Sequence, residues 1–317
     1  FHGAFLWIAA IVPEGVEWDH LSSLRHHMLS MYVLVSPCIL HPDLRAKGIT
    51  NEKDLEWFAR ALQRCQQFDI ETVPLPCPET LYLGNEREPG MFLDRLYTKE
   101  FVALLDTLEE KVREIISKRG PPLFIVGVNS SPACGVNTTW YGPHGSPDAR
   151  KWERGAFLSR FPNIPAIDVS DFSRYRVYLA APLFSLAERR YNIQLADLLR
   201  RNYYEVYLPQ DSGDDSHKRE RDAHMAIFRK NLAALDRSDV VVAVIDGPDV
   251  DSGTAWEMGY AFSKGIPVVS LRTDFRKAGY HEDVNLMLEH SSTVVHSEEG
   301  LVAALLFPGG FQAAHKC

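Results

Sequence analysis

The chain of 317 residues is 45% hydrophobic and carries a formal net charge of -8. Its length suits two domains, and its acidic balance argues against a nucleic-acid-binding protein, because such proteins usually need clustered Lys and Arg. No apolar run reaches the length that spans a membrane. The five scattered cysteines favour a reducing cytoplasm over a secreted disulfide framework.

The predicted elements of the first half begin at Met31. Residues 1–30 hold only a short apolar run interrupted by Pro13, without the basic start of a signal peptide, so we expect them to form a non-native or poorly ordered extension. From Met31 onward, strands are expected at 31–37, 68–74 and 123–129, and helices at 51–66 and 99–118. The stretch "NTTWYGPHGSPDARKW" that follows reads as a long loop.

The second half repeats this alternation. Strands are expected at 176–181, 204–208, 239–245 and 267–272, and helices at 186–201, 221–236, 254–264 and 283–290. Strands that alternate with helices imply right-handed βαβ units and parallel sheets covered on both faces. The sequence therefore predicts an α/β protein with two Rossmann- or flavodoxin-like domains, at 31–168 and 174–317.

An acidic loop follows a strand of β-branched residues in "VVVAVIDGPDVDSGTAWEMGYA". In open parallel sheets, ligands bind beyond the carboxyl ends of the strands. Glu257 would lie near the start of the next helix, where the helix dipole favours an ionised carboxylate. This makes Glu257 a candidate nucleophile of low pKa. The alternative is a capping box of Thr254 and Glu257, in which the Glu only satisfies backbone donors.

Four segments occur in order with suitable gaps: "RVYLAAPLFSLAERRYN", "YEVYLPQD", "DVVVAVIDGPDVDSGTAWEMGYA" and "VNLML". Through them, residues 176–290 resemble the nucleoside 2-deoxyribosyltransferase family. The resemblance implies that Glu257 attacks the anomeric carbon of a 2'-deoxynucleoside and that the base leaves. A second base then takes the sugar from the glycosyl ester, with retained anomeric configuration. No cofactor is implied for this domain.

The resemblance also implies roles for other residues. Asp251 would bind the sugar 5'-hydroxyl and Asn285 would reach it from a neighbouring subunit, which implies a free nucleoside as substrate and a homo-oligomer with shared sites. Tyr178 would support the nucleophile. Phe184 and Gln210 would line the base pocket. From the residues alone, core packing is the simpler interpretation of Tyr178 and Phe184.

Asn231 departs from the family's pattern. The family usually carries an Asp there that handles the proton of the departing or arriving base, and an amide cannot act as a general acid. Either another group such as Asp236 or a water helps the base to leave, or base preference differs, or transfer is weak. A nucleoside N-glycoside hydrolase and a non-catalytic nucleoside-binding module are therefore the alternatives to a transferase.

Three cysteines each follow a predicted strand of the first half: Cys38 in "VSPCIL", Cys77 in "LPCPE" and Cys134 in "SPACG". Strand ends of one parallel sheet share an edge, so the three thiols are expected to converge there. Converging thiolates suit zinc or an iron–sulfur cluster, whereas ordinary buried cysteine is the alternative. Cys65 and Cys317 are interpreted as bystanders.

The first half also carries "CPE", and "SPACG" followed by "RGAFLSRF". With these features, residues 31–168 resemble the 2-thiouracil desulfidase-type family. The resemblance implies a [4Fe-4S] cluster bound through the same three cysteines, with one iron open to take sulfur from a thiolated base. Glu79 and Ser131 would be polar groups near that iron.

The two resemblances are compatible with one purpose. They predict a pentosyltransferase acting on 2'-deoxynucleosides, fused to a desulfidase-like domain, in the salvage of nucleobases and nucleosides. The expected partners are small nucleosides and nucleobases, and neither nucleic acid nor a membrane is expected.

Overall fold

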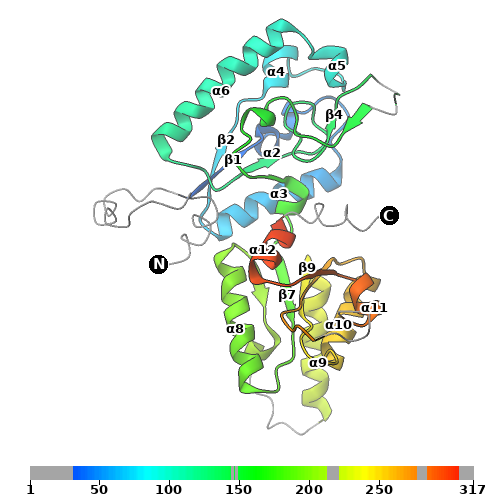
Figure 1. Ribbon diagram of the computed structural model, residues 1–317. Helices are drawn as coiled ribbons and strands as arrows, with labels where there is room; N and C mark the ends of the chain where they lie inside the picture. The colour runs from blue at the N-terminus through cyan, green and yellow to red at the C-terminus, as the bar shows by residue number, and fades with distance from the viewer. Residues whose placement is uncertain (1–30, 144–145, 147–148, 213–220, 277–283, 307–317) are drawn as a thin grey trace, which may run out of the picture. The chain divides into compact units, whose positions relative to one another are not determined.

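The computed structural model describes residues 31–143, 146, 149–212, 221–276 and 284–306 (Figure 1). These residues form two compact units, one ending at Ser173 and the other beginning at Arg174. The expected extension 1–30 and Cys317 lie outside the described residues. Within the described part, no helix combines the length and the apolar character needed to cross a membrane.

The first unit is built on a parallel sheet with the strand order β2-β1-β3-β6. Its strands are β1 (Tyr32–Val35), β2 (Glu71–Pro74), β3 (Ile125–Gly127) and β6 (Ala166–Asp168). Strands β1, β3 and β6 are buried throughout. Continuous burial of this kind is what a parallel sheet covered on both faces produces.

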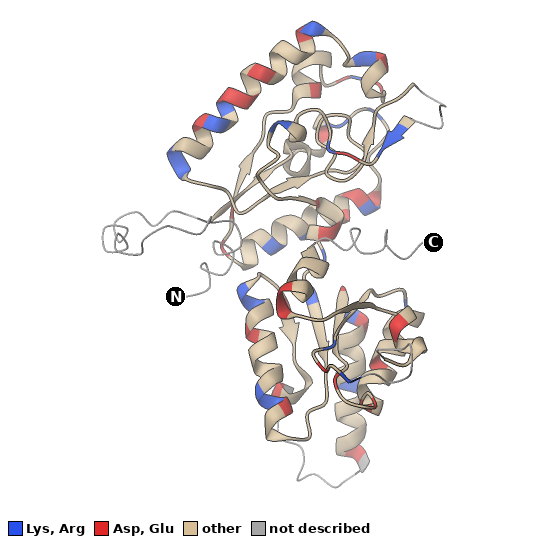
Figure 2. Cartoon of the chain, in the orientation of Figure 1, with Lys and Arg blue, Asp and Glu red and all other residues tan. Residues whose placement is uncertain are grey.

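The helices of the first unit follow their sequence signals. They are α2 (Pro37–Leu40), η3 (Pro42–Leu44), α3 (Glu52–Gln67), α4 (Pro78–Leu83), α5 (Phe92–Arg95), α6 (Lys99–Arg119), η5 (Leu158–Arg160) and α7 (Val169–Phe172). Helix α6 starts where Thr98 accepts from the backbone N–H of Phe101 and ends at Gly120, whose φ of 83° suits glycine. Figure 2 shows acidic and basic residues interspersed along this helix, as expected of a solvent-exposed face.

The region predicted as a long loop differs from that expectation. It contains a short antiparallel pair, β4 (Thr139–Trp140) and β5 (Arg150–Lys151). Strands of two residues are too short for an alternating pattern to reveal them.

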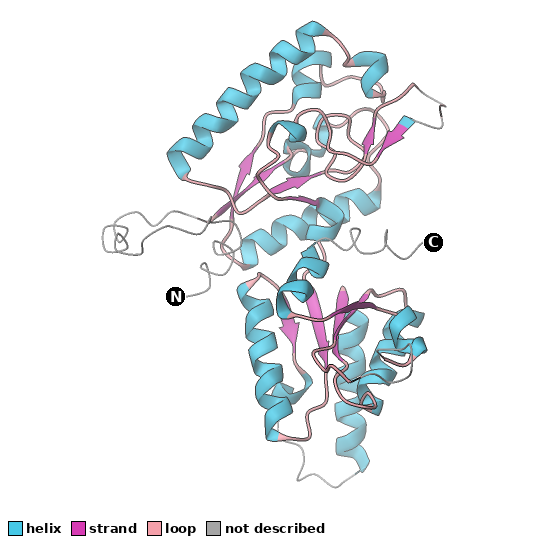
Figure 3. Cartoon of the chain, in the orientation of Figure 1, coloured by secondary structure: helices cyan, strands magenta, loops and turns pink. Residues whose placement is uncertain are grey.

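The second unit contains a five-stranded parallel sheet with the order β11-β10-β9-β7-β8. Its strands are β7 (Arg176–Ala180), β8 (Glu205–Tyr207), β9 (Val240–Val244), β10 (Val268–Leu271) and β11 (Thr293–Val295). Its helices are α8 (Leu186–Arg201), η6 (Pro209–Ser212), α9 (Arg221–Arg237), α10 (Ser252–Ser263), α11 (Leu286–His290) and α12 (Glu298–Leu306). Helix α8 lies on one side of the sheet, and α9 and α10 lie on the other (Figures 1 and 3).

Both sheets confirm the predicted α/β class with parallel βα units. In each, the second strand in the chain lies on one side of the first, and the later strands lie on the other side. This reversal creates a crevice at the carboxyl ends of the two central strands, where ligands of open parallel sheets bind. The relevant strand pairs are β1 with β3 and β7 with β9.

Candidate active site

Helix α10 begins after the buried strand β9 and its acidic loop. Asp251 is the residue that caps it: its Oδ2 accepts from the backbone N–H of Thr254 at 2.9 Å and from the Thr254 hydroxyl at 3.2 Å. The capping box of Thr254 and Glu257 is therefore wrong, because the helix already starts at Ser252. Glu257 lies in the second turn, and its carboxyl is left for another role.

Glu257 is held by the tyrosine that precedes it on β7. The hydroxyl of Tyr178, a fully buried residue, donates to Oε1 of Glu257. Burial raises the pKa of Glu257 to about 7, the Tyr178 hydrogen bond lowers it, and the charge of Asp251 raises it. The expectation of a low pKa is thus wrong, because Glu257 lies beyond the free N–H groups of the first turn and desolvation dominates.

The other acidic residues of the loop are directed to separate partners. Asp246 accepts from the backbone N–H and the hydroxyl of Thr273, both at 2.6 Å. Asp249 is exposed, and Asp251 caps α10. Their mutual repulsion is reduced in this way, and Asp251 is the acidic neighbour that acts on Glu257.

A buried arginine anchors this loop. Arg272, at the end of β10, has 2% of its surface exposed and donates to the carbonyl oxygens of Ile245 at 2.7 Å and Gly247 at 3.4 Å. The backbone N–H of Gly247 also donates to Asp274 at 3.0 Å. The loop that delivers Asp251 is therefore attached to the segment after β10.

Asn231 reaches the same face of the sheet through a second tyrosine. Tyr207 on β8 is the register partner of Tyr178, and their rings stack with centroids 5.4 Å apart. The Tyr207 hydroxyl donates to Oδ1 of Asn231 at 2.9 Å. Asp236, the suggested alternative proton donor, instead accepts from the Tyr260 hydroxyl at 2.6 Å.

The remaining predicted site residues make their hydrogen bonds elsewhere. Phe184, before α8, is 81% exposed. The amide of Gln210 accepts from Asn192 at 3.1 Å and donates to the backbone of α8 at 2.9 Å. Asn285 is exposed and caps α11 by accepting from Met287 N–H at 2.9 Å. The structure thus brings together Glu257, Tyr178, Asp251 and Asn231. No contact joins Phe184, Gln210 or Asn285 to these four among the interactions of the described residues.

Tyr207 adjoins the candidate site and was not predicted from the sequence. A signal was present, because Val-Tyr-Leu occurs at 177–179 and again at 206–208. Neighbouring parallel strands with the same tripeptide in register place both tyrosines on one face.

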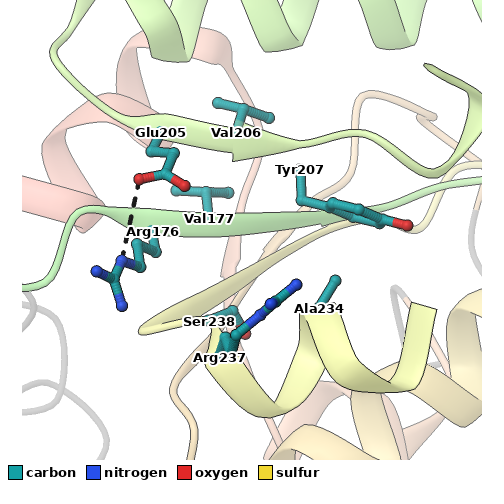
Figure 4. Close-up of a pocket in the computed structure, with 8 residues that line it drawn as sticks. All are labelled: Arg176, Val177, Glu205, Val206, Tyr207, Ala234, Arg237 and Ser238. Carbon is teal, nitrogen blue, oxygen red and sulfur yellow. Dashed lines mark ion pairs between the residues drawn. The ribbon is translucent and has the colours of Figure 1, made fainter. Parts of the chain in front are cut away.

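A hollow of about 420 Å³ is lined by the first residues of β7, by β8 and by the end of α9 (Figure 4). Arg176 and Glu205, which form an ion pair at 3.9 Å, are the first residues of these strands. The hydroxyl of Tyr207 points away from this pair (Figure 4). The lining of this hollow includes Tyr207 but not Glu257, Asp251 or Asn231.

In the first unit, the three predicted cysteines line one cavity of about 620 Å³, together with Glu79 and Ser131. Cys38 follows β1 and Cys77 follows β2, where Cys77 caps α4 with its Sγ accepting from Thr80 N–H at 3.4 Å. The third, Cys134, follows β3.

Glycine at the end of β3 lets the Cys134 loop pack closely. A Cβ on Gly127 would lie 2.7 Å from the carbonyl oxygen of Cys134 and 2.5 Å from Val136, so a side chain there would displace the loop. The position of this thiol thus depends on a residue seven positions earlier in the chain.

The three thiols act on one another electrostatically. Burial raises the pKa of Cys38 to about 12, with a further increase from Cys77. Burial also raises the pKa of Cys134 well above its ordinary value, and Cys77 and Cys38 add to this. Thiols in such surroundings are neutral unless a cationic centre stabilises the thiolates.

Zinc and an iron–sulfur cluster are the two groups that the sequence predicts for the three thiols. Within the described ranges, no three His, Cys, Asp or Glu side chains are placed to hold one metal ion. A cluster carries its cysteine ligands on separate iron atoms. Three thiols that line a common cavity are of the ligand type that such a cluster uses. Cys65 lies apart, buried within α3.

Polar groups beside the thiols are connected. The Ser131 hydroxyl donates to Oε1 of Glu79 at 2.9 Å and accepts from Cys134 N–H at 3.0 Å. The guanidinium of Arg87, which is 5% exposed, lies 3.6 Å from Oε2 of Glu79. The side chain of Glu79 is thus oriented by Ser131 at one carboxylate oxygen and by Arg87 at the other.

Comparisons with known proteins concern the second unit. Residues 177–298 match the family model described as nucleoside 2-deoxyribosyltransferase. The uncharacterized protein UU063 of Ureaplasma parvum is 30% identical over 125 residues, which are 35% of this chain and 78% of that protein. A solved structure of a conserved protein from Enterococcus faecalis is 33% identical, covering 41% of this chain and 96% of that one, with a TM-score of 0.36. A solved 2-deoxyribosyltransferase from Bacillus psychrosaccharolyticus is 22% identical, covering 41% and 95%, with a TM-score of 0.36.

Residues 177–298 therefore form a domain of the nucleoside 2-deoxyribosyltransferase family. It is thereby placed among glycosyl-transfer enzymes that act on small nucleoside substrates.

Proposed function

We propose that the second unit is a nucleoside 2-deoxyribosyltransferase that works through a covalent glycosyl-Glu257 intermediate. The observation that carries this proposal is the partly buried carboxyl of Glu257, held by Tyr178 at the carboxyl edge of the sheet. Because Tyr178 donates to Oε1, Oε2 is the oxygen that attacks. A pKa of about 7 allows a large ionised fraction at neutral pH.

The reaction consists of two displacements at the anomeric carbon. In the first, Oε2 of Glu257 forms a bond to C1' while the bond from C1' to the base nitrogen breaks and its electron pair stays on the base. In the second, the ring nitrogen of another base attacks C1' and the carboxylate leaves. The transition states resemble an oxocarbenium ion, which a carboxylate stabilises, and two inversions retain configuration.

Asp251 supports a free nucleoside as the substrate. Both bonds from Thr254 go to its Oδ2, so Oδ1 can accept the sugar 5'-hydroxyl. A 5'-phosphate at the same place would be repelled by the carboxylate. We place Phe184 and Gln210 at the base and Asn285 at the sugar of a neighbouring subunit, in a homo-oligomer. A fully active monomer in light scattering would contradict this arrangement.

The test is incubation with 2'-deoxyinosine and excess adenine, followed by separation of the products. Transfer yields 2'-deoxyadenosine and hypoxanthine, whereas a hydrolase yields free 2-deoxyribose and a binding module yields neither. Glu257→Ala should abolish exchange without unfolding the protein, because it removes the attacking group. Near-native exchange by this variant would refute the mechanism.

For the first unit we propose a desulfidase-like site that takes thiolated nucleobases, supported by the three thiols on one cavity. Cys38, Cys77 and Cys134 would hold a [4Fe-4S] cluster, which when bound supplies an iron that accepts sulfur. Glu79, oriented by Ser131 and Arg87, would hold or move a proton beside the cavity. Both units would then serve the salvage of nucleobases in the cytoplasm.

A further inference from the structure

Two tyrosines on neighbouring strands each hold one polar group of the candidate active site. Tyr178 and Tyr207 are register partners, and their planes differ by 20°. Tyr178 holds Glu257 of α10, and Tyr207 holds Asn231 of α9. The pair therefore fixes the spacing between the nucleophile and the amide.

The hydrogen bond from Tyr207 determines which end of the amide is presented to a ligand. An asparagine side chain offers a carbonyl oxygen that accepts and an NH2 group that donates. The Tyr207 hydroxyl donates to Oδ1 at 2.9 Å, which directs the NH2 group away from the tyrosine. Asn231 is only partly buried.

We propose that Tyr207 is a positioning residue that fixes Asn231 as a hydrogen-bond donor, so that the site selects nucleobases presenting an unprotonated acceptor atom to it. This inference rests on the proposed transferase function. The substrate class is then purine-like bases with a ring-nitrogen lone pair facing α9.

The donor also acts on the chemical step. When the bond from C1' to the base breaks, the electron pair left on the base spreads over its ring nitrogens. An acceptor nitrogen facing Asn231 therefore gains negative charge in the transition state, and the bond from the amide strengthens without proton transfer. The departing base takes its proton from water afterwards. The accepting base loses its N–H proton to water as its ring nitrogen bonds to C1'.

Removing the Tyr207 hydroxyl frees the amide to turn by half a rotation and present Oδ1. The site would then no longer distinguish acceptor from non-acceptor bases at this position. Tyr207→Phe retains the ring that stacks on Tyr178, so it tests orientation rather than packing. Tyr260→Phe is the matched control, because it removes a tyrosine hydroxyl that also donates to α9, but to Asp236.

The experiment compares kcat/KM for 2'-deoxyadenosine with those for its 3-deaza and 7-deaza analogues, in which one ring nitrogen is replaced by C–H. In the native protein and in Tyr260→Phe, one of the two analogues should have a kcat/KM that is lower than that of the other analogue, relative to 2'-deoxyadenosine. In Tyr207→Phe this additional loss of kcat/KM should be smaller by about tenfold, the value of one hydrogen bond. Comparing ratios between variants cancels the intrinsic difference in leaving ability. An unchanged ratio in Tyr207→Phe would overturn the proposal.

A binding measurement separates this inference from the proposed function. Dissociation constants of adenine and its two deaza analogues are measured by calorimetry for Glu257→Gln, with and without Tyr207→Phe. If exchange is absent in every protein but Tyr207→Phe still removes the discrimination in binding, the transferase proposal fails and the role of Tyr207 stands. If binding ratios are equal with and without the hydroxyl, the role of Tyr207 is refuted.

Discussion

Glu257 combines two demands that oppose each other. A nucleophile must be ionised, yet burial favours the neutral carboxyl and raises its pKa to about 7. The hydrogen bond from Tyr178 to the carboxylate lowers the pKa of Glu257, whereas the negative charge of Asp251 raises it further. A weakly solvated carboxylate is a stronger nucleophile than an exposed one, since less water must be removed before attack.

The pH dependence of exchange follows from this pKa. The free enzyme should show kcat/KM rising about tenfold per pH unit below pH 7 and levelling above it, because only the ionised carboxylate attacks. Asn231 cannot supply a protonated acid, so no falling limb should come from that position. Initial rates across pH 5 to 9 check this; a profile that is flat through pH 7 would contradict the assignment.

The same pKa affects folding. In the unfolded chain Glu257 has its ordinary pKa near 4.5, whereas the folded protein retains the proton up to about pH 7. Between these values the folded state binds more protons, so the free energy of unfolding falls as pH rises. Glu257→Gln should therefore be more stable than the native protein at pH 8 by roughly 1–3 kcal/mol, and equal to it below about pH 4. Urea unfolding at both pH values measures the difference.

At the scale of elements, the loop between β9 and α10 depends on a buried cation. Arg272 donates from Nη1 to carbonyl oxygens of this loop and from Nη2 to the carbonyl oxygen of Arg276. Lysine cannot reproduce this two-armed geometry. Its burial means that lost bonds are not replaced by water.

Arg272→Lys should lower the free energy of unfolding by roughly 1–3 kcal/mol and raise KM for the nucleoside, since the loop delivers Asp251. Arg113→Lys in α6 is the control, because its arginine is 62% exposed in the pair with Glu109 and exposed pairs contribute little. Equal effects of the two substitutions on KM would argue against a role of Arg272 in positioning the loop.

The sequence was most informative where patterns were long. Helices such as α3 and α8 have enough turns for their apolar faces to be counted, whereas β4 and β5 have two residues each. The start of α10 was predicted at the wrong residue because Asp251 and Thr254 can each act as an N-cap, with Thr254 and Glu257 three residues further on. Only the backbone conformation shows that Asp251 caps the helix.

The features of the candidate site also differ in how far the sequence could predict them. Glu257 and the cysteines were recognisable from their places after strands, since topology alone brings strand ends together. The pKa of Glu257 was not, because desolvation depends on every group packed around it. The link between Tyr207 and Asn231 joins separate elements and required the register of β7 and β8.

At the scale of the whole molecule, two sheets of similar strand order present different chemistry at corresponding edges. One carries thiols on Cys38, Cys77 and Cys134, and the other carries carboxyl and amide groups. Each set lies in its own unit, so substitutions can be made in one set while the other is left intact.

Protein purified and reconstituted with iron and sulfide under anaerobic conditions should be brown and contain iron. Ser in place of any of Cys38, Cys77 or Cys134 should remove the colour, because an alcohol is a poor ligand for iron–sulfur clusters. Cys65→Ser, within α3, is the control and should keep it. Colourless native protein after reconstitution would return these cysteines to ordinary packing. Base exchange should be unaffected throughout.

The position of the two tyrosines within their sheet has a consequence for adaptability. Tyr178 lies on an interior strand, with neighbours on both sides, whereas Tyr207 lies on the edge strand β8. Edge strands open locally at lower free energy than interior ones, so amide hydrogens of β8 should exchange with deuterium faster than those of β7. The residues that act on the sugar are thereby supported by an interior strand, which opens rarely. The residues that contact the base are supported by the edge strand, which opens more often. Base preference can therefore diverge through changes at the sheet edge while the nucleophile keeps its support.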